Sequence, residues 1–131
     1  MADACAPTVK GMSPLLIVSD LEAAIDHYTS VLGFAEEFRY EDFYAGLHLD
    51  GYPVHLKTGA VTEAERENRR ANEHVDVIFV VEGVAELARG LTQRGANVVQ
   101  PLRQMPYGTE IYVADPDGYI LSFLEVAPSG S

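Results

Sequence analysis

The chain has few cysteines and few basic residues. Because Cys5 is its one cysteine, an internal disulfide and a cysteine-based zinc site are excluded. There are only 9 basic residues against 20 acidic ones, a net charge of −11, which argues against nucleic acid because phosphates require a basic surface. No apolar run approaches membrane-spanning length, and the first residues do not resemble a secretory signal. We therefore expect a cytoplasmic protein that binds neither nucleic acid nor membrane.

The chain does contain a repeated pattern. Residues 14–33 hold an apolar run, an amphipathic stretch and a closing glycine, and residues 75–95 repeat that order. Three short extended segments follow each repeat. With 131 residues and 47% apolar composition, the chain can bury one proper core. The pattern predicts an α+β fold of two βαβββ modules, which must pack together because one small sheet cannot bury both of its faces alone.

Apolar runs and turn residues give the expected boundaries. We predict a helix in each module, ending at Gly33 and at Gly95. The Asp50-Gly51 pair predicts a tight hairpin. The expected strands are residues 15–18, 34–40, 43–49, 53–58, 75–81, 97–102, 109–114 and 119–126. The expected organisation is a tail over 1–12, one domain over 13–127 with modules 13–58 and 74–127, a linker over 59–73, and a tail over 128–131.

The linker is charged and has no apolar stripe. A solvated segment with some helical character is the main prediction, and a lid over a cleft is the alternative.

Alternation along the strands separates side chains that face the helices from those that face the concave side of each sheet. The concave set combines aromatic rings with scattered polar groups, as in a small-molecule pocket. A closed core or a dimer contact is the alternative use of these rings. The predicted ligand-binding residues from this set are Phe38, Tyr40, Tyr44, His48, His55, Asp76, Glu110, Tyr112 and Ser122.

Acid–base chemistry is a further option on these faces. His48 and His55 can hydrogen-bond a ligand, act as a base or serve a structural role. Glu110 on an opposite strand can complete an acid–base pair with them on geometry alone. No residue is assigned a catalytic role.

Several strings resemble a known superfamily. They are Val18–Glu22 through Tyr28, Val31–Phe34, Pro106-Tyr107-Gly108 and Val113–Tyr119. They are similar to the two modules of the vicinal-oxygen-chelate superfamily, which includes glyoxalase I, extradiol dioxygenases, fosfomycin-resistance enzymes and bleomycin-resistance proteins. The resemblance covers about residues 13–126. It implies paired βαβββ modules with curved sheets round a cleft, and a homodimer that commonly shares the cleft between subunits.

Enzymes of this superfamily hold a divalent metal at one position on each of the first, fourth, fifth and eighth strands. The resemblance places Ser13, His55, Asp76 and Ser122 at these positions. Serine hydroxyls are weak ligands for zinc, nickel or iron. We therefore expect no metal and no other cofactor. A register shift that brings in His74 is the alternative.

The remaining pattern resembles the metal-free bleomycin-resistance branch, whose members sequester a drug in a dimer cleft without chemistry. This resemblance adds Tyr107 to the ligand-binding aromatics. We predict a metal-independent protein that binds an aromatic or cationic small molecule, with antibiotics among the candidates. A metal-dependent lyase, isomerase or dioxygenase is the first alternative, and an antitoxin-like interaction module with a vestigial cleft is the second. The sequence leaves open the ligand and whether modules pair within a chain or swap between chains.

Overall fold

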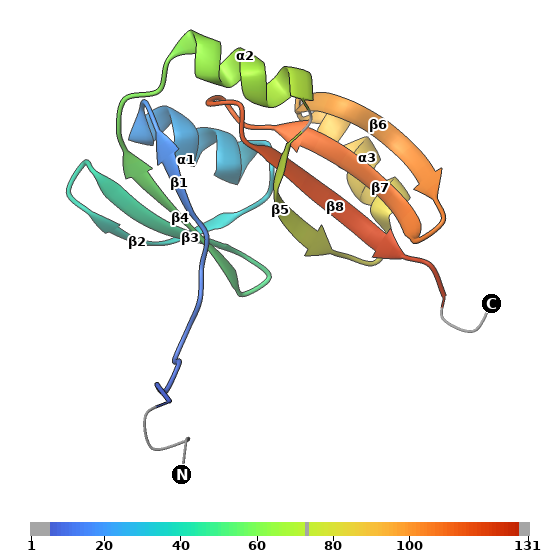
Figure 1. Cartoon of the computed structure of the whole chain (residues 1–131), viewed down its shortest axis with the longest axis horizontal. Helices are drawn as coiled ribbons and strands as arrows, with labels where there is room; N and C mark the ends of the chain where they lie inside the picture. Colours follow the sequence, from blue (N-terminus) through green and yellow to red (C-terminus); the bar gives the residue numbers. More distant parts are fainter. Residues whose placement is uncertain (1–5, 73, 129–131) are drawn as a thin grey trace.

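The computed structural model describes residues 6–72 and 74–128 (Figure 1). Residues 1–5, 73 and 129–131, with Cys5 and parts of the predicted tails and linker, lie outside the described residues. In chain order the elements are β1 (Leu15–Val18), α1 (Leu21–Ser30), β2 (Ala35–Tyr40), β3 (Tyr44–Leu49), β4 (Tyr52–Thr58), α2 (Glu63–Asn72), β5 (Val75–Val80), α3 (Val84–Gln93), β6 (Asn97–Met105), β7 (Gly108–Ala114) and β8 (Ile120–Val126).

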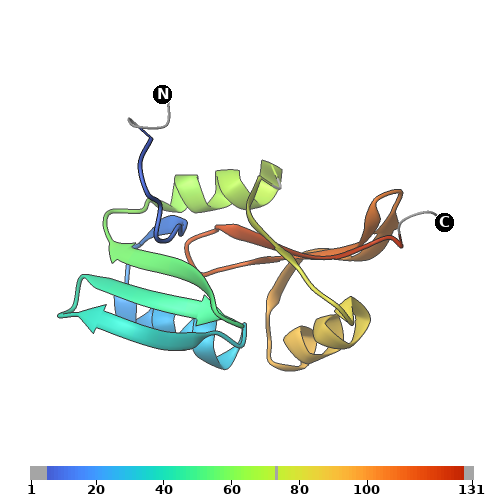
Figure 2. The same cartoon turned by 90° about the horizontal axis from the view of Figure 1, so that it is seen from below.

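The predicted α+β fold of two βαβββ modules is confirmed. One sheet has the strand order β1-β4-β3-β2 and the other has β5-β8-β7-β6. The β1–β4 and β5–β8 pairs are parallel and the remaining pairs are antiparallel, so both sheets are mixed. Helix α1 packs on β2, β3 and β4, and α3 packs on β6, β7 and β8 (Figure 2). No helix among the described residues is long and apolar enough to cross a membrane.

Three helix boundaries follow from local chemistry, and the start of α3 depends on a distant residue. The Asp20 carboxylate caps α1 by accepting a hydrogen bond from the Ala23 N–H at 3.1 Å. Gly33 adopts φ +86° after α1, and Gly95 adopts φ +87° after α3, as predicted for left-handed caps. The start of α3 is capped from a distance, because Glu125 on β8 accepts a hydrogen bond from the Val84 N–H at 3.0 Å.

The predicted hairpin turn is also present. Asp50 and Gly51 have φ values of +50° and +86°, as a tight turn with two positive φ angles requires. On the sheets, the alternation holds along β4, where Val54 and Leu56 are fully buried and His55 between them is not.

The linker has the helical character that was predicted, in the form of the ten-residue helix α2. Its long-range polar contacts were not predicted. One expected strand differs from the structure. Strand β6 continues to Met105 instead of ending at 102, because register shifts let its far half keep pairing with β7. Arg103 therefore lies in a strand.

The core is continuous across the two modules, since buried residues of both form one hydrophobic cluster. A run of ring contacts crosses the junction from Tyr28 through Phe34 and Phe79 to Phe123, with centroids 5.2, 5.6 and 5.7 Å apart. This packing holds the helix-bearing sides of the two sheets together.

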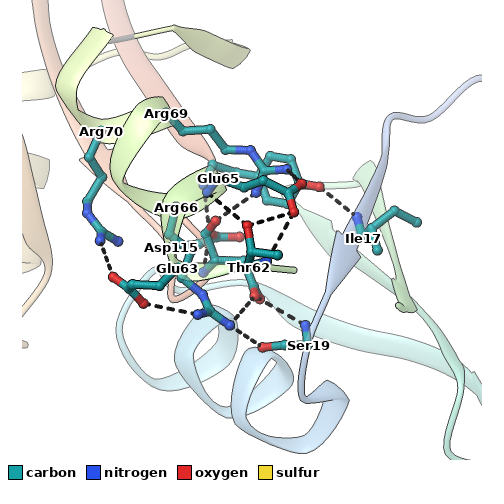
Figure 3. Close-up of polar contacts among 11 residues, drawn as sticks. Ile17, Ser19, Thr62, Glu63, Glu65, Arg66, Arg69, Arg70 and Asp115 are labelled. Atoms are coloured by element: carbon teal, nitrogen blue, oxygen red, sulfur yellow. Dashed lines mark hydrogen bonds and ion pairs between the residues drawn. The ribbon is translucent and has the colours of Figure 1, made fainter. Parts of the chain in front are cut away.

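Helix α2 braces the same junction from another side (Figure 3). Arg66 donates to the Ser19 hydroxyl at 3.0 Å and pairs with the buried Asp117 carboxylate at 3.4 Å. Arg69 donates to the Asp117 carbonyl at 2.7 Å and lies over the Tyr119 ring, 4.1 Å from its centroid. These contacts join the turn before β8 to the loop before α1, and so connect the second module to the first.

Candidate functional site

One open sheet surface is aromatic. Phe38, Tyr40, Tyr44 and His55, from β2, β3 and β4, lie together, and we call them the aromatic face. The Phe38 and Tyr44 rings are nearly parallel, at 15° with centroids 6.2 Å apart. The His55 ring meets Phe38 edge-on at 5.3 Å, and its Nδ1 is 2.8 Å from the Tyr44 hydroxyl. The hydrogen bond and the edge contact hold three of the four rings in fixed relative positions.

Gly46 makes this arrangement sterically possible. It pairs with Phe38 across β2 and β3, and a Cβ at this position would overlap the Phe38 ring. The ring therefore lies directly against the backbone of β3. A glycine in a strand interior often marks such a close approach.

The second sheet carries a polar cluster on the side away from α3. Its members are Arg103 on β6, Tyr107 in the following turn, and Glu110 and Tyr112 on β7, and we call them the polar face. The Glu110 carboxylate, in a residue only 2% exposed, accepts a hydrogen bond from the Tyr107 hydroxyl at 2.9 Å. Arg103 contacts the other Glu110 oxygen through Nε at 2.8 Å and Nη2 at 2.7 Å.

The protonation states in the polar face suit its hydrogen bonds. The hydrogen bond to Glu110 is the main cause that raises the pKa of the Arg103 guanidinium above its usual value. A hydrogen bond to the same carboxylate raises the pKa of the Tyr107 hydroxyl. Both groups therefore stay protonated as donors at neutral pH, and Glu110 accepts from both.

The other predicted site residues, and His74, have different surroundings from these two faces. His48 Nδ1 accepts a hydrogen bond from the Gly51 N–H at 3.3 Å, within its own hairpin turn. Asp76 Oδ2 accepts from the Ile120 N–H at 2.9 Å. Ser122 is only 2% exposed, whereas His74 is exposed. Among the described residues, no hydrogen bond joins Glu110 to a histidine.

The four positions of the superfamily metal site form a poor donor set here. Ser13 and Ser122 offer neutral hydroxyls, which bind transition metals weakly. Asp76 and His55 are each engaged in a hydrogen bond within the chain. Across residues 6–72 and 74–128, no three or more His, Cys, Asp or Glu side chains group so that they could hold a metal ion. The residues present therefore do not fit a catalytic transition metal.

Within one chain the two faces are only partly exposed: Tyr40 and Tyr107 are 61% and 47% exposed, whereas Glu110 is buried. Four hollows with volumes of about 320, 410, 440 and 620 Å³ lie elsewhere, and neither the aromatic nor the polar face lines any of them. The largest lies between the β3–β4 turn and β5, near Tyr52 and Phe79. The structure thus places seven of the ten predicted ligand-binding residues on two separate surfaces, and His48, Asp76 and Ser122 belong to neither.

Arg103 is the member of these surfaces that the sequence analysis missed. The expected strand end at 102 left it in a loop. The available signal was the hairpin centred on the Pro106-Tyr107 turn, which sets Arg103 opposite Glu110 across β6 and β7.

The paired βαβββ modules and their open sheet faces define a class of small α+β proteins built by duplication. The chain belongs to the Glyoxalase/Bleomycin resistance protein/Dioxygenase superfamily, whose family model matches residues 10–123.

The curated relatives include enzymes. The lactoylglutathione lyase of Escherichia coli O157:H7 is 29% identical over 135 residues, covering 88% of this chain and 92% of the relative. The enzyme of the same name from Salmonella typhimurium is 26% identical over 125 residues, with the same coverage.

Solved structures share the fold. TioX from Micromonospora sp. ML1 has a TM-score of 0.73 at 23% identity, covering 91% of this chain and 100% of that one. The bleomycin-binding protein of Streptomyces verticillus, solved with copper(II)-bleomycin, has a TM-score of 0.70 at 18% identity, covering 93% of this chain and 100% of that one.

Proposed function

We propose that this protein binds and sequesters an aromatic or cationic small molecule, such as an antibiotic, without a metal or other cofactor. The cleft is formed by a homodimer in the cytoplasm, with the aromatic face on one side and the polar face on the other. The observation that carries the proposal is the ring arrangement around Phe38, whose ring Gly46 allows to lie directly against the backbone of β3. Such a surface suits the stacking of a planar ligand.

The donor chemistry of the four metal positions supports binding without catalysis. Two of the four are serines, and the other two are engaged within the chain. Without a strong ligand set, the Lewis-acid chemistry of the superfamily enzymes has no basis at these positions.

The exposure of β5 supports a shared cleft. Ile78 and Val80 on this edge strand are 60% and 67% exposed, on the sheet side that also carries the polar face. Exposed apolar side chains on an edge strand favour contact with a second chain. Members of the superfamily are commonly dimers that bind small molecules, which agrees with this arrangement.

Ligand titration tests the proposal. We expect saturable binding of bleomycin or of the planar dye acridine orange, measured by calorimetry. Phe38→Ala removes a stacking ring and should weaken binding about tenfold or more. Phe43→Ala is the matched control, because Phe43 is 44% exposed in the β2–β3 turn, outside the aromatic face. Equal affinities in all three proteins would remove the case for this surface.

Mixing two variants tests whether copies share the cleft. Phe38→Ala alters the aromatic face and Tyr112→Ala alters the polar face. If each cleft combines faces from two copies, a mixed dimer holds one cleft with both faces intact. Equal mixing after denaturation and refolding then restores about a quarter of the wild-type binding capacity, because about half of the dimers are mixed. Absence of any recovery would mean that both faces of a cleft come from the same chain.

A metal-dependent lyase, isomerase or dioxygenase is the second candidate, favoured by the curated relatives named lactoylglutathione lyase. Elemental analysis of protein purified without chelators separates the two functions. About one equivalent of nickel, zinc or iron per subunit, together with lactoylglutathione lyase activity, would show that the protein is an enzyme rather than a sequestering protein.

A homodimer without a ligand-sized cleft would instead favour the antitoxin-like interaction module.

A further inference from the structure

We propose that Arg103 anchors an oxygen acceptor of the ligand, a carbonyl or a carboxylate, carried on a planar group that lies against Tyr112. This inference rests on the proposed binding function and narrows it: of aromatic and cationic ligands, the polar face selects an aromatic one with an oxygen acceptor directed at Arg103.

The guanidinium of Arg103 is held in one orientation. Its Nε and Nη2 both contact a single oxygen of Glu110, at 2.8 and 2.7 Å. The second oxygen of Glu110 is fixed by the Tyr107 hydroxyl at 2.9 Å, and Glu110 is buried. A donor that is already oriented in the free protein loses little entropy when a ligand binds.

One edge of this guanidinium remains available. The Arg103 side chain is 33% exposed, and no hydrogen bond joins its Nη1 to another residue in the part of the chain that the structure describes. Its Cζ lies 5.2 Å from the centroid of the Tyr112 ring, and Nη2 is 3.4 Å from the Tyr112 hydroxyl. The guanidinium therefore lies over the Tyr112 ring and keeps N–H donors at its exposed edge.

The charges of the polar face favour an acceptor over a cation. Glu110 is the buried carboxylate of this cluster, and Arg103 compensates its charge directly. Asp76 lies on β5, separated from β7 by β8, and one of its oxygens accepts the Ile120 N–H. A cationic group would therefore meet a guanidinium and hydroxyl groups, whereas an oxygen acceptor would meet an unused donor.

Three ring compounds of equal shape test this inference: benzoate, benzamide and benzamidinium, with charges of −1, 0 and +1. The observable is the Arg103 Nε–H signal in ¹H–¹⁵N spectra of the full chain. We expect benzoate and benzamide to shift this signal saturably, and benzamidinium to leave it unchanged. Benzoate binding alone would restrict the acceptor to a carboxylate. A response to benzamidinium alone, or to none of the three, would overturn the inference.

Two variants separate ligand contact from a purely structural ion pair. Arg103→Lys keeps the charge beside Glu110 but loses the planar donor edge, so benzoate and benzamide affinities should fall about tenfold. Glu110→Gln leaves the guanidinium charge uncompensated, so the ratio of benzoate to benzamide affinity should rise about tenfold. Circular dichroism confirms folding of both variants. If Glu110→Gln is folded and its ratio of benzoate to benzamide affinity equals that of the wild type, Arg103 has no ligand role.

The result is independent of the test of the proposed function. Suppose that Phe38→Ala weakens the binding of acridine orange or bleomycin, but none of the three ring compounds shifts the Arg103 Nε–H signal. Only this inference then fails. If Phe38→Ala leaves the binding of acridine orange and bleomycin unchanged, the proposed function fails, whatever the Arg103 signal shows.

Discussion

The substitution Asp115→Asn probes a buried carboxyl group at the module junction. Asp115 lies in the turn before β8 and is only 2% exposed. Its carboxylate accepts hydrogen bonds from the Tyr28 hydroxyl at 2.8 Å and from the N–H groups of Asp117 and Tyr119, each at 2.9 Å. Asparagine has nearly the same shape and can satisfy these partners with its carbonyl and amide groups. The substitution therefore removes the charge and changes little else.

Burial raises the pKa of Asp115 from 3.8 to about 6, although its hydrogen bonds act in the opposite direction. A folded-state pKa above the unfolded value means that the folded protein binds the proton more tightly. The contribution of this group to stability is therefore present at low pH and is lost as the pH rises from about 4 through about 6. The shift corresponds to about 3 kcal/mol in total. About half of this free energy is lost between pH 5 and pH 8.

Urea denaturation followed by circular dichroism measures this effect. The difference in unfolding free energy between the wild type and Asp115→Asn cancels the titration of the other groups. We expect the wild type to lose about 1 to 2 kcal/mol relative to the variant between about pH 5 and about pH 8. Working above the pI of about 4.6 avoids precipitation. A difference that is constant across this range would refute the argument from burial.

Three further substitutions have defined outcomes. Gly46→Ala should displace the Phe38 ring and abolish stacking of a planar ligand, measured by calorimetry, at a cost of only about 1 kcal/mol in unfolding free energy. Glu125→Ala removes the remote cap of α3 and should cost about 1 kcal/mol in urea denaturation; an unchanged midpoint contradicts this. Arg69→Met removes the guanidinium that lies over Tyr119 and donates to the Asp117 carbonyl, and should lower the free energy of unfolding in urea by about 1 to 2 kcal/mol. An unchanged free energy would mean that α2 does not brace the junction.

The features set by local periodicity could be predicted from the sequence. Side chains alternate between the two faces of a strand, so Val54 and Leu56 go to the core while His55 goes to the other side. A glycine at a helix end and an Asp-Gly pair in a hairpin determine the local backbone conformation, because each residue readily adopts the positive φ that the turn requires. Gly33 and Asp50 therefore have the conformations that their neighbours in sequence predict.

The features that depend on distant residues could not be predicted in this way. Helix α2 has no apolar stripe, and Arg66 finds its partner Asp117 51 positions further along the chain. Register shifts in β6 interrupt the alternation of side chains before Arg103, so alternation from the start of the strand does not predict which face Arg103 lies on. His48 contacts its own hairpin turn, a use that its residue type does not distinguish from ligand binding.

The net charge of −11 does not by itself set the charge of the ligand, because four carboxylates near the module junction and the polar face have partners within the chain. Asp115 and Asp117 are buried at the module junction. Glu110 is neutralised by Arg103, and Asp76 accepts a backbone N–H. In the proposed site, ligand preference would then depend on donors at fixed positions rather than on the long-range field of the net charge, which salt screens within about 10 Å. An oxygen acceptor on a flat ring fits such donors better than a positive charge does.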